Sequence, residues 1–345
     1  MEMDLIRQTG SQIPFAAVSA AALRGRAPWT LARNLVVLGR GIRQAAGLLK
    51  RFAPQAVLVT GGYVTIPVGV AAWRRRIPLL TYLPDIVPGL AVRFLARLAS
   101  RVATTAPDST RYLPHGKAVA IGYPVRPELL QTDRRQARAH WGVADGQKAL
   151  LIYGGSRGAR SINQAVAADL PAFLQRAIVI HICGREGDEV WLRQRADGLP
   201  ADLRARYHLH PYLHEGMVEA LVAADVTICR AGASTLGELP AVGLPAILVP
   251  YPYVHQEENA DYLVGHGAAI KVPDARLRGA EGRPDASALL QALQTILDDP
   301  AVHQRMVEAA RGLARPHAAQ AVVEQLRSLA GDMEEAAPRP DKGGE

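Results

Sequence analysis

The sequence has little of several features that define whole classes of protein. Its 345 residues include only two cysteines, Cys183 and Cys229, too few for a disulfide scaffold or a cysteine-based zinc site. No stretch approaches the ~18 uninterrupted apolar residues of a membrane-spanning helix, which excludes a polytopic membrane protein. The acidic start, from Met1 to Asp4, does not have the pattern of a secretory signal. We therefore expect a cytoplasmic protein, and at ~150 residues per domain we expect two domains.

Acidic residues are scarce in the first part of the chain. Residues 1–126 carry 17 Lys and Arg against four Asp and Glu, whereas the other 219 residues carry 23 against 28. Such asymmetry predicts that the first half faces an anionic partner, either nucleic acid or a membrane surface. Aromatic residues make up only 5% of the chain, and no helix-turn-helix or ribonucleoprotein pattern is present, which disfavours nucleic acid.

Several catalytic motifs are also missing. The sequence contains no His-Glu-x-x-His pair, no Walker P-loop and no Asp-x-Asp clasp. Zinc peptidases, P-loop NTPases and metal-clasp transferases are therefore disfavoured.

Short apolar runs alternate with helical segments along the chain, which predicts parallel sheets covered on both faces. We expect an α/β fold of two Rossmann-like, doubly wound domains facing a cleft. The expected strands are 56–60, 79–82, 102–105, 118–121, 149–153, 177–183, 207–210, 226–229, 246–249 and 268–271. The expected helices lie near 64–75, 90–99, 159–169, 188–196, 217–224, 235–242, 256–265, 287–298, 301–314 and 318–330.

The polar and apolar stretches also predict the domain boundaries. We expect an N-terminal domain over 1–128, a polar linker over 129–147, a second domain over 148–315, a closing helix over 316–330 and a disordered tail over 331–345. Ligands of such folds bind outside the carboxyl ends of the strands. The loops that follow the strands are therefore the first places to look for a site.

One such loop is rich in glycine. Gly154, Gly155 and Gly158 lie between an expected strand and an expected helix. Glycines allow a tight turn, and the start of the helix offers free N–H groups and a positive dipole end to an anion. Ser156 adds a hydroxyl donor. A simple strand–helix turn is the alternative, but the context favours a diphosphate site.

A second loop of small residues has the same placement and opens another helix. Ser234 and Thr235 can donate hydroxyl hydrogens to phosphate, and Glu238, one turn further on, can accept from two adjacent hydroxyls such as those of a ribose. For Glu238 alone, a carboxylate stabilised by the helix dipole is the better interpretation. The first loop in the same domain favours a nucleotide site instead. The loop comprises Gly232, Ala233, Ser234, Thr235, Leu236 and Gly237.

Two more residues suit a nucleotide-sugar ligand. Gln256 offers both a donor and acceptors for sugar hydroxyls. Arg126, at the edge of the first domain, could bind a diphosphate through two hydrogen bonds, with an ordinary surface arginine as the close alternative. His255, Glu257 and Glu258 are contiguous rather than at helical i, i+4 spacing, so we expect no metal site there.

Basic residues interrupt the apolar helical segments of the first half. An ordinary amphipathic helix explains each of them singly. Together with the charge excess they predict a patch that binds an anionic membrane surface. These residues are Arg33, Arg40, Arg43, Lys50 and Arg51 within 31–52, then the arginines at 74–76, 93, 97 and 101.

Six motifs together resemble the MurG family of N-acetylglucosaminyltransferases, in glycosyltransferase family 28. The resemblance covers roughly residues 1–330. In chain order the motifs are Gly61-Gly-Tyr-Val-Thr-Ile-Pro67, Pro88-Gly-Leu90, Gly122-Tyr-Pro-Val-Arg126, Gly154-Gly-Ser-Arg-Gly-Ala159, Cys229-Arg-Ala-Gly-Ala-Ser-Thr235 with Glu238, and His255-Gln256 with Asn259-Ala260.

The resemblance implies a GT-B fold, UDP-GlcNAc as donor, lipid I as the polyprenyl-linked acceptor and an inverting reaction of peptidoglycan synthesis. It also implies no cofactor or metal, a peripheral position on the cytoplasmic face of the cell membrane, and cell-wall synthesis proteins as partners. By position, it places the donor diphosphate at Arg126, Ser156 and the glycine-rich loop, and the rest of UDP along Gly232–Gly237. Glu238 would bind the ribose, Gln256 the GlcNAc, and a backbone group near His214 the uracil. Gly61, Gly62, Tyr63 and Asp85 would lie on the acceptor side.

Two differences from the family pattern bear on the activity. Family members begin with a strand and a Gly-Gly-Thr-Gly-Gly-His loop whose His is the candidate base, whereas residues 1–6 match the family downstream of that loop. We therefore expect an N-terminally incomplete first domain and assign no catalytic base. The family's His-Glu-Gln-Asn is replaced by Tyr82-Leu-Pro-Asp85, which leaves the acceptor open.

Three alternatives to the transferase on lipid I remain at this point. One is a glycosyltransferase acting on another glycolipid. Another is a non-catalytic scaffold that binds UDP-sugars, or half of a split enzyme. A UDP-GlcNAc epimerase is less favoured, because it would not need a basic, membrane-facing half.

Overall fold

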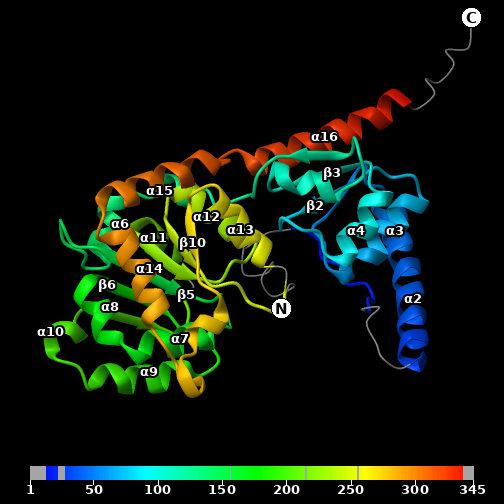
Figure 1. Ribbon diagram of the computed structural model, residues 1–345. Helices are drawn as coiled ribbons and strands as arrows, with labels where there is room; N and C mark the ends of the chain where they lie inside the picture. The colour runs from blue at the N-terminus through cyan, green and yellow to red at the C-terminus, as the bar shows by residue number, and fades with distance from the viewer. Residues whose placement is uncertain (1–12, 22–27, 156, 214–215, 255, 337–345) are drawn as a thin grey trace, which may run out of the picture.

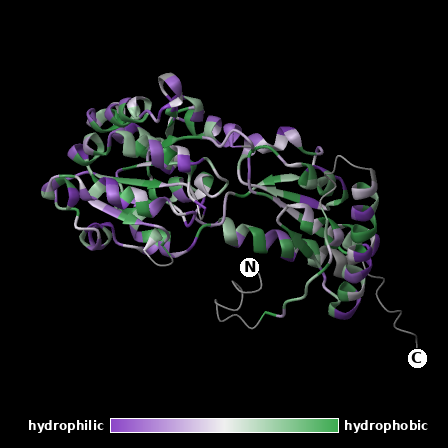
Figure 2. Cartoon of the chain, turned by 90° about the horizontal axis from the view of Figure 1, so that it is seen from below, coloured by the Kyte–Doolittle hydropathy of each residue, from purple (hydrophilic) through white to green (hydrophobic). Residues whose placement is uncertain are grey.

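The computed structural model describes residues 13–21, 28–155, 157–213, 216–254 and 256–336. They form two parallel sheets, each packed between helices, and the two layered domains lie side by side (Figure 1). The expected α/β class with two parallel-sheet, Rossmann-like domains is confirmed. The second sheet is doubly wound, whereas the strands of the first follow one another in consecutive order. Hydrophobic residues concentrate in the two sheets (Figure 2).

The N-terminal domain has a four-stranded sheet in the order β1-β2-β3-β4. Helices α3 and α4 cover one face of the sheet, and α2 packs on the outside of α3. The strands are β1 (Val57–Val59), β2 (Leu79–Leu83), β3 (Arg101–Thr104) and β4 (Ala118–Ala120). The helices are α2 (Pro28–Phe52), α3 (Ile66–Arg74) and α4 (Leu90–Leu98), with the 3-10 turns η1 (Tyr63–Thr65) and η2 (Pro107–Tyr112).

The second domain has a six-stranded sheet in the order β10-β9-β8-β5-β6-β7. Its strands are continuous apolar runs because both faces are buried: Leu150 and Ile152 of β5 join one core, while Leu151 and Tyr153 join the other. The strands are β5 (Ala149–Tyr153), β6 (Ile178–Ile182), β7 (Tyr207–His210), β8 (Val226–Cys229), β9 (Ala246–Leu248) and β10 (Ala269–Lys271).

Helices cover both faces of this larger sheet (Figure 1). They are α7 (Arg160–Ala168), α8 (Leu170–Arg176), α9 (Asp188–Asp197), α10 (Ala201–Arg204), α11 (Met217–Ala223), α12 (Thr235–Val242), α13 (Glu257–Gly265), α14 (Ser287–Leu297) and α15 (Pro300–Leu313), with the turns η3 (Asp274–Leu277) and η4 (Ala280–Gly282). Asp299 caps α15 by accepting from the amide of Ala301 at 2.8 Å, with Pro300 in the first turn.

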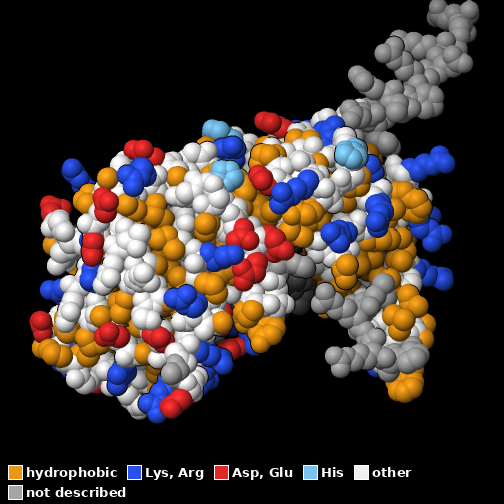
Figure 3. Space-filling model, in the orientation of Figure 1, with side chains coloured by type: hydrophobic (Ala, Val, Ile, Leu, Met, Phe, Trp, Pro, Cys, Tyr) orange, Lys and Arg blue, Asp and Glu red, His pale blue; other side chains and the backbone are white. Residues whose placement is uncertain are grey.

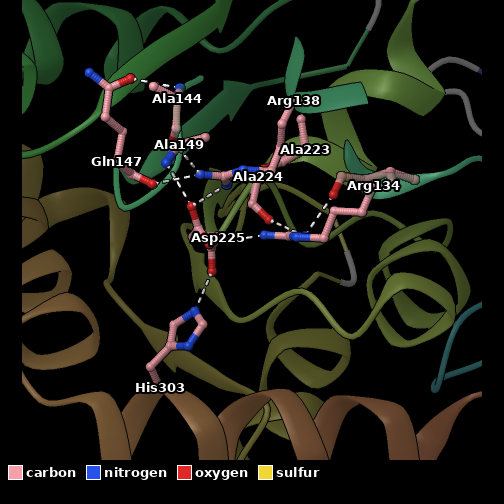
Figure 4. A network of polar contacts seen from close by, with 10 residues as sticks. Arg134, Arg138, Ala144, Gln147, Ala149, Ala223, Ala224, Asp225 and His303 are labelled. Atoms are coloured by element: carbon pink, nitrogen blue, oxygen red, sulfur yellow. Dashed lines mark hydrogen bonds and ion pairs between the residues drawn. The ribbon is translucent and has the colours of Figure 1, made fainter. Parts of the chain in front are cut away.

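The segment 129–147, expected as a polar linker, contains α5 (Glu128–Gln131) and α6 (Arg134–His140), and both pack on α11. Asp225, directly before β8, holds α6 in place. Its two carboxylate oxygens accept from Arg134 at 2.9 Å and from Arg138 at 3.0 Å (Figure 4). The polar stretch is therefore a helical part of the second domain, because its arginines reach a carboxylate far along the chain.

The last helix, α16 (Ala318–Ala336), returns to the N-terminal domain and covers the second face of its sheet. Val322 and Leu329 pack there against Leu80 and Tyr82 of β2. The helix runs to Ala336, into the region 331–345 where we expected a disordered tail; residues 337–345 lie outside the described residues. The second domain's chain thus completes the core of the first.

No helix among the described residues is long and apolar enough to cross a bilayer. Helix α2 instead exposes large apolar side chains, with Trp29 78% and Val36 72% exposed. Lysine and arginine side chains project from the N-terminal domain around it (Figure 3). The basic and apolar residues that the sequence singled out in 31–52 therefore share one surface helix.

Candidate functional site

The candidate site lies where the carboxyl ends of β5, β8 and β9 face the N-terminal domain. These three strands are neighbours in the sheet, and Tyr153 at the end of β5 pairs with Cys229 at the end of β8. The loops that follow the two strands, which begin at Gly154 and Arg230, therefore start side by side. Both predicted anion-binding loops belong to the same edge of one sheet, as ligand sites of this fold require.

The loop after β5 depends on glycine. Gly155 and Gly158 have φ values of 84° and 85°, a region that favours glycine, and the amide of Gly158 donates to Gly155 O at 2.9 Å. A Cβ on Gly158 would collide with the carbonyl oxygen of Cys183, so the loop packs directly on the end of β6. A Cβ on Gly154 would collide with the backbone nitrogen of Ala159. Ser156 lies outside the described residues.

A buried polar chain supports this loop from behind. The side-chain amide of Asn163, on α7, donates to Cys183 O and to Asp188, both at 2.8 Å. Its oxygen lies 3.0 Å from His181 Nε2, and the other ring nitrogen of His181 lies 2.8 Å from the hydroxyl of Tyr207. Burial lowers the pKa of His181 to about 3, so the ring is neutral at physiological pH.

The loop after β8 opens α12. The Thr235 hydroxyl donates to Gly232 O at 2.6 Å, so it stabilises the turn rather than being free for phosphate, in contrast to the expectation from the sequence. Leu236 is buried in the core, which leaves only its backbone for a ligand. Ala233 and Ser234 are partly exposed at the start of the helix.

Glu238 lies in the first turn of α12, and Arg126 approaches it from the segment that joins the two domains. Nη2 of Arg126 is 3.7 Å from Oε1 of Glu238. Burial raises the pKa of Glu238, while the charge of Arg126 and a hydrogen bond with the Ser234 side chain lower it. The side chain of Arg126 is 49% exposed, so it retains donors for a second anion.

Gly237 allows the joining segment to come this close to α12. A Cβ at Gly237 would lie 2.6 Å from Cβ of Tyr123, which belongs to the segment that joins the domains. Burial raises the pKa of Tyr123, and the nearby charges of Glu238 and Asp85 raise it further. The phenol therefore stays protonated between two carboxylates that belong to different domains.

Gln256 lies at the end of the loop after β9. Its Oε1 accepts from the amide of Tyr251 at 2.9 Å, which leaves the side-chain NH2 group to face a ligand. The rings of Tyr251 and Tyr253, in the same loop, lie 5.3 Å apart, and Tyr253 is 82% exposed. His214 and His255 lie outside the described residues.

The residues expected on the acceptor side follow β1 and β2, which are paired. Gly61 and Gly62 have φ values of 93° and 77° and lead into η1, where Tyr63 is 48% exposed. Asp85 follows β2 and accepts from the side chain of Asn259 at 2.8 Å. The expected acceptor residues therefore lie at one edge of the N-terminal sheet, and one of them contacts the second domain.

Sequence reasoning missed the central role of Asn259. This fully buried amide accepts from the backbone of Ile86 at 2.9 Å and donates to Asp85 and to Ala231 O at 3.0 Å. It links the loop after β2 to the loop after β8. The sequence motif included Asn259, but only the fold shows that it contacts Asp85 and Ile86, more than a hundred positions away in the chain.

Sequence reasoning also missed the role of Arg230. This arginine was part of the motif after β8, yet its partners could not be identified from the sequence.

In the part of the chain that the structure describes, no group of three or more His, Cys, Asp and Glu side chains is placed to hold a metal ion.

Comparisons with known proteins agree with this geometry. The glycosyltransferase family 28 N-terminal domain matches residues 3–104, and the family 28 C-terminal domain matches residues 149–322. A Roseiflexus sp. protein named UDP-N-acetylglucosamine--N-acetylmuramyl-(pentapeptide) pyrophosphoryl-undecaprenol N-acetylglucosamine transferase is 48% identical over 95% of this chain and 81% of its own.

Solved structures extend the comparison to three dimensions. The crystal structure of Acinetobacter baumannii MurG superposes with a TM-score of 0.71 at 26% identity, covering 95% of this chain and 88% of that one. A Neisseria meningitidis UDP-GlcNAc 2-epimerase bound to UDP-GlcNAc has a TM-score of 0.61 at 17% identity, covering 85% of this chain and 81% of that one. The second likeness shows the shared fold alone.

Proposed function

The chain belongs to the MurG family, within glycosyltransferase family 28, and we propose that it transfers GlcNAc from UDP-GlcNAc to N-acetylmuramyl-(pentapeptide) pyrophosphoryl-undecaprenol. It is a hexosyltransferase with the GT-B fold, and its reaction belongs to peptidoglycan synthesis. The observation that carries the assignment within the site is the approach of Arg126 to Glu238 beside the two loops that follow β5 and β8.

The donor site is proposed along the carboxyl edge of the second sheet. Glu238 accepts from the ribose hydroxyls, and the loop of Gly154, Gly155 and Gly158 presents amides to the diphosphate. The NH2 group of Gln256 contacts the GlcNAc. The pairing of Glu238 with Arg126 supports these roles, because it puts a ribose acceptor and a diphosphate donor within one ligand's length.

Departure of UDP leaves negative charge on the diphosphate. We propose that Arg126 and the N–H groups at the starts of α7 and α12 stabilise this charge, with no metal cofactor. Both helices begin directly at the glycine-containing loops, so their positive ends face the place where the charge develops. The half-exposed Arg126 supplies a side-chain donor in addition to these backbone groups.

The acceptor is proposed to enter over the carboxyl edge of the N-terminal sheet, past Gly61, Gly62, Tyr63 and Asp85. Its lipid remains in the bilayer, and α2 rests on the anionic cytoplasmic surface of the membrane. The exposed Trp29 and Val36 and the five basic residues of α2 support a peripheral contact of this kind. Cell-wall synthesis proteins are the partners that this location favours.

Calorimetric titration with UDP-GlcNAc tests the proposal, with ADP-glucose as the control nucleotide sugar. We expect saturable binding of UDP-GlcNAc and of UDP, and none of ADP-glucose. Absence of binding by both uridine nucleotides would contradict the donor assignment. Product analysis then separates a transferase from a binding scaffold, and an acceptor series with diacylglycerol separates lipid I from other glycolipids.

A further inference from the structure

Arg230 makes the densest set of polar contacts at the candidate site. Its side chain is 12% exposed, and Nη1 donates to Asp274 Oδ1 at 2.6 Å while Nη2 donates to the Ser161 hydroxyl at 2.8 Å. Ser161 in turn donates to the same oxygen of Asp274 at 2.7 Å. The three side chains therefore form a closed triangle of charge-assisted hydrogen bonds, which are the stronger kind.

The same guanidinium also holds the loop after β9. Nη1 donates to Val249 O at 3.1 Å and to Pro250 O at 3.4 Å, and the ring of Tyr251 lies over the guanidinium at 5.2 Å. The amide of Tyr251 donates to Gln256 Oε1. A chain of contacts therefore runs from Arg230 through Tyr251 to the side chain that we propose to meet the donor sugar.

These partners come from four different strand ends. Arg230 follows β8, Pro250 follows β9, Asp274 follows β10, and Ser161 lies in the first turn of α7 after β5. The four strands are consecutive in the sheet, in the order β10-β9-β8-β5. Arg230 thus ties together every loop on this half of the carboxyl edge.

Both amino groups of Arg230 are engaged by protein atoms, and the ion pair with Asp274 is largely buried. An arginine in a loop beside a diphosphate site would otherwise suggest a phosphate ligand. Lysine cannot replace this guanidinium, because a single ammonium group does not present two amino groups in fixed directions.

We propose that Arg230, with Asp274 and Ser161, is a positioning clamp for the donor sugar. The clamp fixes segment 249–254 so that Gln256 is oriented before the donor binds, and it does not itself contact the nucleotide. This inference rests on the proposed function for its ligand, but the clamp also has a signature in the free protein.

The first test is amide hydrogen exchange of the ligand-free Arg230→Lys variant. We expect faster exchange in segment 249–254, including the amide of Tyr251, with unchanged exchange in β6 on the other side of the sheet. The matched control is Arg176→Lys, which alters an Arg–Asp pair between α8 and Asp298 far from the site. It should leave exchange in 249–254 at the wild-type rate.

The second test compares two ligands. Because Gln256 is assigned to the sugar and Glu238 to the ribose, Arg230→Lys should weaken UDP-GlcNAc binding by about tenfold and UDP binding by no more than about twofold. In turnover, KM for UDP-GlcNAc should rise about tenfold while kcat changes by less than about threefold. Asp274→Asn keeps an oxygen that can accept from Ser161, and its effect should be smaller.

The outcomes distinguish the clamp from the function it rests on. Unchanged exchange in 249–254 of a folded Arg230→Lys protein would overturn the clamp. An equal loss of UDP and UDP-GlcNAc affinity would also overturn it, because the defect would then involve the whole nucleotide site. Wild-type protein that binds neither nucleotide would overturn the proposed function, whereas the exchange result would still decide whether Arg230 holds the loop.

Discussion

The guanidinium of Arg126 lies 3.7 Å from the carboxylate of Glu238, and Arg126 comes from the segment that joins the two domains, whereas Glu238 belongs to the second domain. In the free protein each charge partly neutralises the other. A nucleotide diphosphate that binds Arg126 and a ribose that binds Glu238 would take over both partners at once. The pair therefore links donor binding to the position of the segment that joins the two domains.

Removing the Glu238 carboxylate should weaken donor binding. We expect Glu238→Ala to reduce the affinity for UDP by about 1–3 kcal/mol, the free energy lost when ribose hydroxyls are left unpaired. Calorimetry measures the change. Glu189→Ala is the matched control, because Glu189 pairs with Arg193 on α9 and its removal should leave UDP affinity unchanged. A wild-type dissociation constant for Glu238→Ala would remove this residue from the site.

The affinity for UDP-GlcNAc should also depend on pH through Glu238. Burial raises the pKa of this carboxyl, so it takes up a proton at a pH above its usual 4.5. Binding of UDP-GlcNAc, whose diphosphate does not titrate near neutral pH, should weaken as the pH falls through this raised pKa, because the protonated carboxyl is a poorer acceptor. Glu238→Gln has no titrating group at this position, and its affinity for UDP-GlcNAc should change much less over the same range.

The free energy of unfolding should depend on pH in the opposite direction from ligand binding. A carboxyl whose pKa is raised by folding contributes stability at low pH and loses it as the pH rises through the folded pKa. Glu238→Gln should therefore unfold at a higher denaturant concentration than wild type at pH 7. Equal midpoints at pH 7 would mean that Arg126 fully offsets the burial.

Asp225 should matter for stability and not for the ligand. It holds Arg134 and Arg138 of α6 at the opposite edge of the sheet and also accepts from the amide of Ala149 at 2.8 Å (Figure 4). Asp225→Asn leaves two guanidinium groups without their anion, and we expect a loss of about 2–4 kcal/mol in the free energy of unfolding. Chemical denaturation measures it. A large fall in UDP affinity, measured at a temperature at which the variant is still fully folded, would contradict this separation of stability from ligand binding.

The apolar surface of α2 should contribute to membrane binding. Val36→Asp puts a charge on a side chain that is 72% exposed, and we expect about tenfold weaker binding to vesicles that contain phosphatidylglycerol. Val190→Asp, on the exposed face of α9 in the second domain, is the matched control and should bind normally. Wild-type sedimentation that is equal with neutral and anionic vesicles would contradict an electrostatic contribution.

Much of the fold could be predicted from local patterns, because buried parallel strands are apolar without interruption. The polar stretch from Asp133 to Gln136 was misleading for a physical reason. Asp133 caps α6 by accepting from the amide of Gln136 at 2.9 Å, and Arg134 and Arg138 both pair with Asp225. A charged segment whose partner lies so far along the chain resembles a linker in the sequence alone.

The site shows the same division. The glycine-rich loop and Glu238 could be located, because strand–loop–helix order fixes which residues face a ligand. The hydroxyl of Thr235 was assigned to phosphate, but it donates to Gly232 O within its own turn. The partnership of Arg230 with Asp274 could not be inferred, because it depends on which strands are neighbours in the folded sheet.

The most direct test of the account is mass analysis of the lipid product. The purified chain is incubated with UDP-GlcNAc and the undecaprenyl-linked muramoyl-pentapeptide acceptor, with EDTA present to remove free metal ions. The account predicts that the acceptor gains one N-acetylhexosamine and that one UDP is released for each product formed. Consumption of UDP-GlcNAc to an epimer or to free sugar with the acceptor unmodified, or the absence of any turnover, would contradict it.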